Sequence, residues 1–238
     1  LSDEGNLFEQ TSPENHAMIA VCFEKIIGSA PVKETWNEQH FERLGKVTAR
    51  MHVLARDFSQ PERYMHWNET PKSFVFDLLP SDDRNLPALF QLLVDQFSQL
   101  PKTKDNYGII HYDIHHGNYL IRKSDNKPVL FDFEMVCQNW FMMEAATVLY
   151  YANMHPSSAD FSDFEQVFMD HFWKGYEQVY SFDKKDQEHI PKFLLYRDLL
   201  VFGYLHKIWD INSLEGTNLV YFKRISDSIA YRRKALKM

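Results

Sequence analysis

The sequence predicts an α+β fold in which a short β-rich start leads into a mainly helical body. Strand-like stretches occur in residues 5–27 and 118–133, whereas every strong signal beyond residue 141 has helical periodicity. No internal repeat and no clear linker divides the 238 residues, of which 45% are apolar and available for a core. We therefore expect one cooperative unit in which strands and helices share a core.

The N-terminal segment predicts a β-hairpin. Its two strand-like stretches lie within residues 5–27, on either side of the turn sequence SPEN, and the second stretch is rich in apolar residues. Ser, Pro and Asn favour turns because their side chains stabilise or pre-set the turn backbone. A hairpin is therefore the simplest arrangement of these residues.

Two helices are expected in the next part of the chain. Thr35 followed by Glu38 has the spacing of a capping box. Apolar residues then recur at helical intervals, at Phe41, Leu44, Val47, Met51, Leu54 and Phe58. The segment ALFQLLVDQFSQL, residues 88–100, carries the next helical pattern, which ends near Pro101 because proline cannot continue a helix.

The second strand-like region predicts another hairpin. NYLIR at residues 118–122 and PVLFDF at residues 128–133 have the composition of short strands, and SDNK between them supplies turn residues. This hairpin follows directly on the most polar motif of the sequence, so the motif is expected on the hairpin and on the loop that leads into it.

The rest of the chain is predicted to be helical. MMEAATVLYYA at residues 142–152 gives the first helix, and Ser162 with Glu165 three residues later indicates the start of the next. Two long aromatic-rich helices complete the chain. The basic end AYRRKALKM is interpreted as cations in the last turns of a helix, where they complement the helix dipole.

Charge and cysteine content exclude several classes of protein. The net charge of −7 argues against a nucleic-acid surface, which needs clustered Lys and Arg. Cys22 and Cys137 are far apart with no CxxC, which favours a reducing, cytoplasmic compartment over a disulfide framework or a thiolate metal site. The longest apolar run, near AMIAVCF, is too short to cross a membrane, and the first residues do not have the pattern of a signal peptide.

The stretch HYDIHHGNYLIRKSDNKPVLFDFEM, residues 111–135, holds the candidate site. Asp113 and Asn118 are five residues apart in a short loop, and Asp132 follows an apolar strand nineteen residues after Asp113. A loop–strand–turn–strand path returns Asp132 to that loop. Hard oxygen ligands for Mg²⁺ and one further carboxylate to orient a hydroxyl are what phosphoryl transfer from a nucleotide requires.

At these residues the sequence resembles a known family. HYDIHHGN matches the H-x-D-x-x-x-x-N catalytic loop of the protein-kinase-like fold, and its HxDxHxGN form looks like the aminoglycoside phosphotransferase family, relatives of choline and homoserine kinases. FDFE resembles the metal motif of that family, and CFEKIIGSA resembles its hinge between lobes. The resemblance implies that residues 1–27 are the last strands of the nucleotide-binding small lobe plus the hinge. Residues 28–238 are then the helical large lobe with the catalytic loop and the acceptor site.

The resemblance also implies a role for each matching residue and the cofactors ATP and Mg²⁺. Asp113 is the catalytic aspartate, and Asn118 and Asp132 are the Mg²⁺ ligands. The adenine contacts are the backbone of Glu24 and Ile26, with Phe23 lining the pocket. In the same loop, His111 is expected to support the structure and Gly117 to permit the tight turn before Asn118. The activity implied is ATP-dependent transfer of a phosphoryl group to a hydroxyl of a small molecule.

Some features of the family are missing from the chain. The Gly-rich loop, the strand lysine and the helix glutamate of a kinase small lobe do not occur before the hinge. Because the chain begins at Leu1 rather than Met, we expect that the natural protein has a preceding stretch and is an active enzyme. The alternative hypothesis is a non-catalytic, kinase-like binding module. A smaller departure is Glu144, where the family more often has Asp.

Two alternative interpretations concern the reaction and its acceptor. A metal-dependent hydrolase would use His111, His115 and His116 as ligands, although no HxHxDH or HExxH pattern occurs. Protein Ser or Thr is a less favoured acceptor than a small hydroxyl compound such as an aminoglycoside, amino alcohol or sugar. The sequence does not predict the oligomeric state.

A further alternative concerns the aromatic residues. They invite the hypothesis of a cation–π box for a quaternary ammonium substrate, although aromatics at helical spacing usually belong to a core. The aromatic residues considered for such a box are Trp140, Phe141, Trp173, Tyr176, Tyr204 and Trp209.

Overall fold

Helices make up most of the structure. The computed structural model describes residues 8–11, 18–21, 23–59, 61–69, 78–80, 85–155 and 161–238. The α-helices in this part of the chain are α1 (Glu38–Arg56), α3 (Leu86–Ser98), α4 (Phe141–Met154), α5 (Phe161–Tyr176), α6 (Ile190–Ile208) and α7 (Gly216–Leu236). Short 3₁₀ helices cover Lys33–Thr35, Pro61–Arg63, Lys184–His189 and Ile211–Ser213. The predicted helical body beyond residue 141 is therefore confirmed.

In the described residues the strands form three small antiparallel sheets. Their bounds are β1 (Phe8–Thr11), β2 (Met18–Val21), β3 (Gly28–Ser29), β4 (Tyr107–Ile110), β5 (Tyr119–Arg122), β6 (Pro128–Leu130) and β7 (Cys137–Trp140). β1 pairs with β2, β4 pairs with β7, and β5 lies between β3 and β6. The N-terminal hairpin is confirmed by the β1–β2 pair, although the turn sequence SPEN lies outside the described residues.

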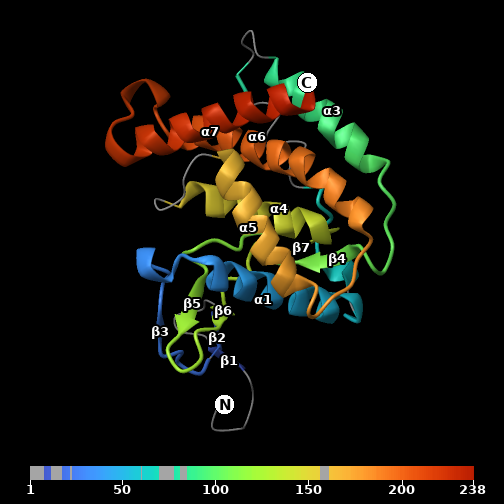
Figure 1. Cartoon of the computed structure of the whole chain (residues 1–238), viewed down its shortest axis with the longest axis vertical. Coiled ribbons are helices and arrows are strands. Elements are labelled where there is room, and N and C mark those ends of the chain that lie inside the picture. The colour runs from blue at the N-terminus through green and yellow to red at the C-terminus, as the bar shows by residue number, and fades with distance from the viewer. Residues whose placement is uncertain are drawn as a thin grey trace.

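Figure 1 shows how these elements are arranged. β1, β2, β3, β5 and β6 gather near the N-terminus at one end of the molecule, and α7 and the C-terminus lie at the other end. α4 and α5 lie between α1 on one side and α6 with α7 on the other. The small sheets therefore meet the helical body on the side of α1.

The hairpin predicted for residues 118–133 is confirmed in β5 and β6. Its turn is closed by the N–H of Arg122 donating to the carbonyl of Lys127 at 2.9 Å, and Arg122 also pairs with the Asp125 carboxylate. Asn126 adopts the left-handed backbone region, with φ of 56°, which Asn tolerates better than most residues. The second strand ends at Leu130, so the FDF sequence that follows is not strand but leaves the sheet toward the loop.

Helix α1 begins later than the sequence predicted. Its N-cap is Asn37, whose side chain accepts a hydrogen bond from the N–H of His40 at 3.1 Å. Thr35 instead closes the preceding 3₁₀ turn, where its hydroxyl donates to the carbonyl of Val32 at 2.9 Å. The capping box proposed at Thr35 is therefore wrong, although the helix itself is confirmed.

The buried face of α1 also differs from the predicted apolar stripe. Leu54 is 72% exposed, whereas Gly45 and the smaller side chains near it face α5. A Cβ on Gly45 would lie 1.9 Å from the carbonyl oxygen of Phe172, and one on Gly175 would lie 1.8 Å from that of Glu42. The two backbones thus touch at two glycines, an approach that hydrophobic periodicity does not reveal.

Helix α4 is buried on almost all sides. All its residues except Tyr151 and Met154 are inaccessible to solvent, because α1, α5 and α6 contact it from different directions. Such an all-round apolar sequence is typical of a central helix. α4 is thus the rigid element against which the candidate site is built.

The basic C-terminal sequence divides into two parts. Arg233 and Lys234 lie in the last turn of α7, as predicted for cations that complement the helix dipole. Arg232 instead turns inward, where its Nε donates to the carboxylate of Asp198 at 3.0 Å and Nη2 pairs with Glu165. The sequence did not predict this buried network.

The described residues were also searched for a segment able to cross a membrane. None of the helices in them combines the length and the apolar character that such a crossing needs.

Candidate active site

The loop between β4 and β5 carries the polar motif. Its last turn is closed by the N–H of Asn118, which donates to the carbonyl of His115 at 2.8 Å. A Cβ on Gly117 would lie 2.7 Å from the His115 ring, so the glycine is required for space. The tight turn expected before Asn118 is present, although the φ of Gly117 does not lie in the left-handed region that favours glycine. Loop residues 111–118 thus fold back on themselves beside α4.

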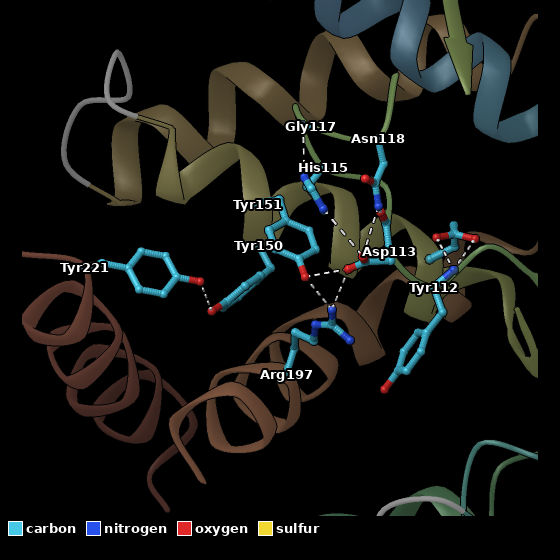
Figure 2. Close-up of polar contacts among 10 residues, drawn as sticks. Tyr112, Asp113, His115, Gly117, Asn118, Tyr150, Tyr151, Arg197 and Tyr221 are labelled. Carbon is cyan, nitrogen blue, oxygen red and sulfur yellow. Dashed lines mark hydrogen bonds and ion pairs between the residues drawn. The ribbon is translucent and has the colours of Figure 1, made fainter. Parts of the chain in front are cut away.

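Asp113 lies at the centre of the contacts in Figure 2. Its Oδ1 accepts hydrogen bonds from the hydroxyl of Tyr151 at 2.6 Å and from Nη2 of Arg197 at 3.2 Å. Its Oδ2 accepts one from Nδ2 of Asn118 at 3.0 Å and lies 3.5 Å from Nε2 of His115. Both carboxylate oxygens are therefore held by groups from the loop, α4 and α6.

These contacts keep Asp113 ionised. Burial by itself would raise the pKa of Asp113, but the hydrogen bonds from His115 and Tyr151 and the positive charge of Arg197 outweigh it and lower the pKa to about 2. The carboxylate is consequently a weak base at neutral pH. It is suited to accept a hydrogen bond and orient the donor rather than to take a proton early.

The neighbouring contacts fix the tautomer of His115. The N–H of Gly117 donates to Nδ1 of His115 at 2.9 Å, so this nitrogen carries no proton. The proton of the ring is then on Nε2, which faces Asp113. His115 therefore presents a donor to the carboxylate.

Asn118 links the loop to the candidate metal position. Its Nδ2 donates to both the main-chain oxygen and Oδ2 of Asp113, each at 3.0 Å. Because these partners are acceptors, the amide nitrogen must face Asp113, and the amide oxygen is left as a hard ligand atom. Its main-chain carbonyl accepts from the N–H of Phe131 at 3.0 Å, which brings the residue before Asp132 alongside Asn118.

Asp132 lies just beyond the end of β6. It adopts the left-handed backbone region with a φ of 63°, and Tyr112 in the loop between β4 and β5 does the same with a φ of 66°. Non-glycine residues in this region store strain, and such residues cluster at functional sites. The buried ring of His111 ties the two segments together, with its Nε2 donating to the carbonyl of Phe131 at 2.9 Å.

Glu144 of α4 was noted in the sequence only as a departure from the family pattern, and its role in the site was not predicted. Its carboxylate accepts from the main-chain N–H groups of His111 at 2.5 Å and Tyr112 at 3.0 Å. Burial raises the pKa of Glu144 to about 7, although those two hydrogen bonds and Arg197 act in the opposite direction. The residue that departs from the family pattern thus anchors the strained backbone next to Asp113.

Arg197 and Tyr151 were also missed. The guanidinium of Arg197 is buried, and its Nη2 donates to the Tyr151 hydroxyl at 2.7 Å as well as to Asp113. A signal did exist in the sequence, since Arg197 stands inside the apolar run FLLYRDLLVF, where a charge must find a buried partner. The sequence alone could not say that the partner is Asp113.

The three residues expected to contact adenine lie on the segment before β3. Phe23 is 87% exposed, Glu24 is exposed and Ile26 is partly buried. The segment is held at the edge of the β3–β5–β6 sheet, where the N–H of Lys123 donates to the carbonyl of Ile27 at 2.9 Å. The segment expected to be the hinge thus ends in β3, which belongs to the same small sheet as β6, the strand that leads to Asp132.

The histidines do not form the metal site that a hydrolase would need. In the residues that the structure describes, no three His, Cys, Asp or Glu side chains are placed to bind one ion. His111 is engaged with the Phe131 carbonyl, and the rings of His115 and His116 are 5.9 Å apart at nearly right angles. The geometry gives the hydrolase hypothesis no support.

The aromatic residues considered for a cation–π box are divided between core and surface. Trp140, Phe141 and Tyr176 are buried in the core, whereas Tyr204 is 45% exposed. The first three therefore cannot line an open pocket together with the last. A cavity of about 480 Å³ does lie between α5, α6 and α7, but the site residues Asp113, Asn118 and Asp132 do not line it.

Comparison with known proteins agrees with this geometry. A model of the phosphotransferase enzyme family matches residues 12–182. An amicoumacin kinase of Bacillus subtilis (strain 168) is 32% identical over 210 residues, which are 85% of this chain and 62% of that protein. The chain thus spans less than two thirds of the length of this relative.

Solved structures show the same fold. An amicoumacin kinase in complex with AMP-PNP, Ca²⁺ and Ami matches with a TM-score of 0.82 and 29% identity, covering 98% of this chain and 71% of that one. A microcompartment-associated aminopropanol kinase matches with a TM-score of 0.72 and 18% identity, covering 99% and 74%. The predicted protein-kinase-like α+β fold and the suspected family are both confirmed, and the chain belongs to the phosphotransferase enzyme family.

Proposed function

We propose that the protein is an ATP-dependent phosphotransferase that moves the γ-phosphoryl group of Mg·ATP to a hydroxyl of a small molecule. The observation that carries this proposal is the placement of Asp113 beside Asn118, whose main chain holds the residue before Asp132. The match to the kinases of the family supports the same activity. A non-catalytic binding module would not require this set of groups.

In the proposed reaction Asp113 acts as the catalytic residue. Its carboxylate accepts a hydrogen bond from the acceptor hydroxyl and points the oxygen at the γ-phosphorus. A weak base suffices because the transition state of phosphoryl transfer is loose, so that orientation matters more than early removal of the proton. The low pKa of Asp113 is compatible with this role.

The residues present fit a divalent cation. Asp132 supplies a carboxylate and Asn118 an amide oxygen, and two such hard ligands suit Mg²⁺, which keeps water and phosphate oxygens as its other ligands. When bound, Mg²⁺ would neutralise charge on the phosphates of the nucleotide. The related kinase structure with AMP-PNP and Ca²⁺ supports a nucleotide and a divalent cation at this site.

The proposal assigns the remaining segments as follows. Residues 1–27 belong to the end of the nucleotide-binding small lobe and the hinge, and residues 28–238 form the large lobe with the acceptor site. The main chain of Glu24 and Ile26 contacts adenine, and the exposed ring of Phe23 covers it. Burial of so exposed a ring on nucleotide binding would be favourable.

The acceptor is proposed to be a small hydroxyl compound of the kind that the relatives' names describe. Amicoumacin is the first compound to test, because relatives of that name match at 32% and 29% identity. Aminopropanol and spectinomycin follow, since kinases named for them share the fold. The identity of the acceptor is left to such a screen, because the fold alone does not determine the substrate.

The test is ADP release by the full-length protein with each compound, measured by a coupled assay with Mg·ATP. We expect release that depends on one small hydroxyl compound and disappears in Asp113→Asn. Labelling of only protein Ser or Thr would overturn the choice of acceptor. Stoichiometric zinc and hydrolase activity would overturn the phosphotransferase itself.

A further inference from the structure

The two oxygens of the Asp113 carboxylate have different surroundings. Oδ1 accepts two hydrogen bonds, from the hydroxyl of Tyr151 at 2.6 Å and from Nη2 of Arg197 at 3.2 Å. Nη2 of Arg197 also donates to the Tyr151 hydroxyl at 2.7 Å. Oδ2 accepts one short hydrogen bond, from Asn118 at 3.0 Å, and one long one, from Nε2 of His115 at 3.5 Å. Each carboxylate oxygen can accept about two hydrogen bonds. Both positions of Oδ1 are therefore occupied at short distance, whereas one position of Oδ2 is occupied only by the 3.5 Å contact with His115.

The Tyr151–Arg197 pair is held rigidly. The guanidinium carbon of Arg197 lies 4.8 Å from the centre of the Tyr112 ring and 5.3 Å from that of Tyr151, within reach of cation–π attraction. The hydrogen bonds given above orient the Tyr151 hydroxyl completely, because it accepts from Arg197 and donates to Asp113. Figure 2 shows this closed triangle between α4, α6 and the loop.

The charge of Arg197 is directed at the site. In the described residues, Nη2 of its guanidinium donates to both Asp113 and Tyr151, and its buried Nε has no hydrogen-bond partner. A buried cation without full hydrogen bonding is a poor stabiliser of a fold. The two hydrogen bonds from Nη2 of Arg197 therefore both act on Oδ1 of Asp113, one directly and one through the Tyr151 hydroxyl.

We propose that Tyr151 and Arg197 form a positioning clamp that fixes Oδ1 of Asp113 and so presents Oδ2 to the acceptor hydroxyl. This inference rests on the proposed function and deepens it by naming the reactive oxygen. The acceptor hydroxyl replaces the loose His115 contact at Oδ2, while Asn118 and the clamp keep the carboxylate plane in place. Tyr151 and Arg197 are positioning residues, because they act on the substrate only through Asp113.

The chain offers a closely matched pair of variants. Tyr151→Phe removes the hydroxyl that donates to Asp113. Tyr150→Phe removes the hydroxyl of the adjacent residue on α4, which lies 3.4 Å from that of Tyr221 and away from Asp113. Both variants keep the ring, so that they differ in the contact with the carboxylate and not in the packing of α4.

The first measurement is steady-state kinetics of the full-length variants. For Tyr151→Phe we expect kcat to fall roughly 10- to 100-fold, the loss typical of a hydrogen bond to a charged group or of a misplaced reacting group. The KM for ATP should stay within about twofold, because the nucleotide is held elsewhere, and Tyr150→Phe should match the wild type. Arg197→Lys should retain more activity than Arg197→Met. Equal kcat in the two tyrosine variants would contradict the clamp.

The second measurement does not need turnover. Crystal structures of the two tyrosine variants should show a changed Asp113 side chain in Tyr151→Phe and an unchanged one in Tyr150→Phe. An unchanged Asp113 in both would overturn the clamp. If the wild type transfers phosphate to no hydroxyl compound, the proposed function fails, and the crystal structures still decide whether the clamp exists.

Discussion

Replacing Glu144 by Gln should change how the stability of the protein depends on pH. Burial raises the pKa of this carboxyl from 4.5 to about 7 in the folded protein, while in the unfolded chain it returns to its ordinary value. Between these two values the folded protein holds a proton on Glu144 that the unfolded chain has lost. Unfolding then releases a proton, so that the contribution of Glu144 to stability falls as the pH rises through this window.

The size of the effect follows from the shift. Each pKa unit corresponds to about 1.36 kcal/mol. Between pH 4.5 and 7 the wild type should therefore lose about 3 kcal/mol of unfolding free energy relative to Glu144→Gln. Glutamine does not titrate, so its variant lacks this slope while all other groups are shared. Since Glu144 is fully buried, no discount for solvent screening applies.

Urea unfolding at several pH values between about 5 and 8 measures this difference. Glu188→Gln is the control, because Glu188 is exposed and its variant should follow the wild type throughout. Parallel pH curves for the wild type and Glu144→Gln would refute the reasoning. They would mean that Glu144 stays ionised while it accepts the two main-chain hydrogen bonds.

Three further outcomes follow from the structure. Asp113→Asn should still bind Mg·ATP, but its kcat should be about 10²- to 10⁴-fold lower, the loss typical when a general base is removed. An unchanged kcat would contradict the catalytic role of Asp113. Asp132→Ala should weaken Mg²⁺-dependent nucleotide binding by more than about tenfold in calorimetric titration. Wild-type affinity in this variant would contradict the assignment of Asp132 as a Mg²⁺ ligand. Gly45→Ala should lower the unfolding free energy measured in urea by about 3 kcal/mol or more, because its Cβ would clash with the Phe172 carbonyl. Gly216→Ala is the control: no atom lies within 4 Å of its Cβ, so it should lose only about 1 kcal/mol, which comes from its positive φ.

Much of the fold was predictable because it depends on local patterns. The N-terminal hairpin, the β5–β6 hairpin and the long helices were read from turn residues and periodicity, and the structure confirms them. The β4 and β7 strands were not, because each has only four residues and the 26 residues 111–136 lie between them. The buried face of α1 was predicted only in part. Phe41 and Leu44 are buried as the periodicity indicates, but the close backbone contact at Gly45 and Gly175 leaves no apolar pattern to detect.

The candidate site was predictable only where its residues are close in sequence. Asp113 and Asn118 lie on one loop and contact each other, and the hairpin that follows brings Phe131, the residue before Asp132, to Asn118. Tyr151 and Arg197 reach Asp113 from α4 and α6, and such long-range contacts depend on how the helices pack. The adjacent charges Arg197 and Asp198 in an apolar helix indicate buried partners without identifying them.

The central claim is tested most directly by a product analysis. The full-length protein would be incubated with Mg·ATP and amicoumacin, and in parallel with the other small hydroxyl compounds, and the products examined by mass spectrometry. The account predicts that one compound gains the mass of a single phosphoryl group in wild type and not in Asp113→Asn. Phosphorylated product in equal amounts from the wild type and Asp113→Asn would contradict it.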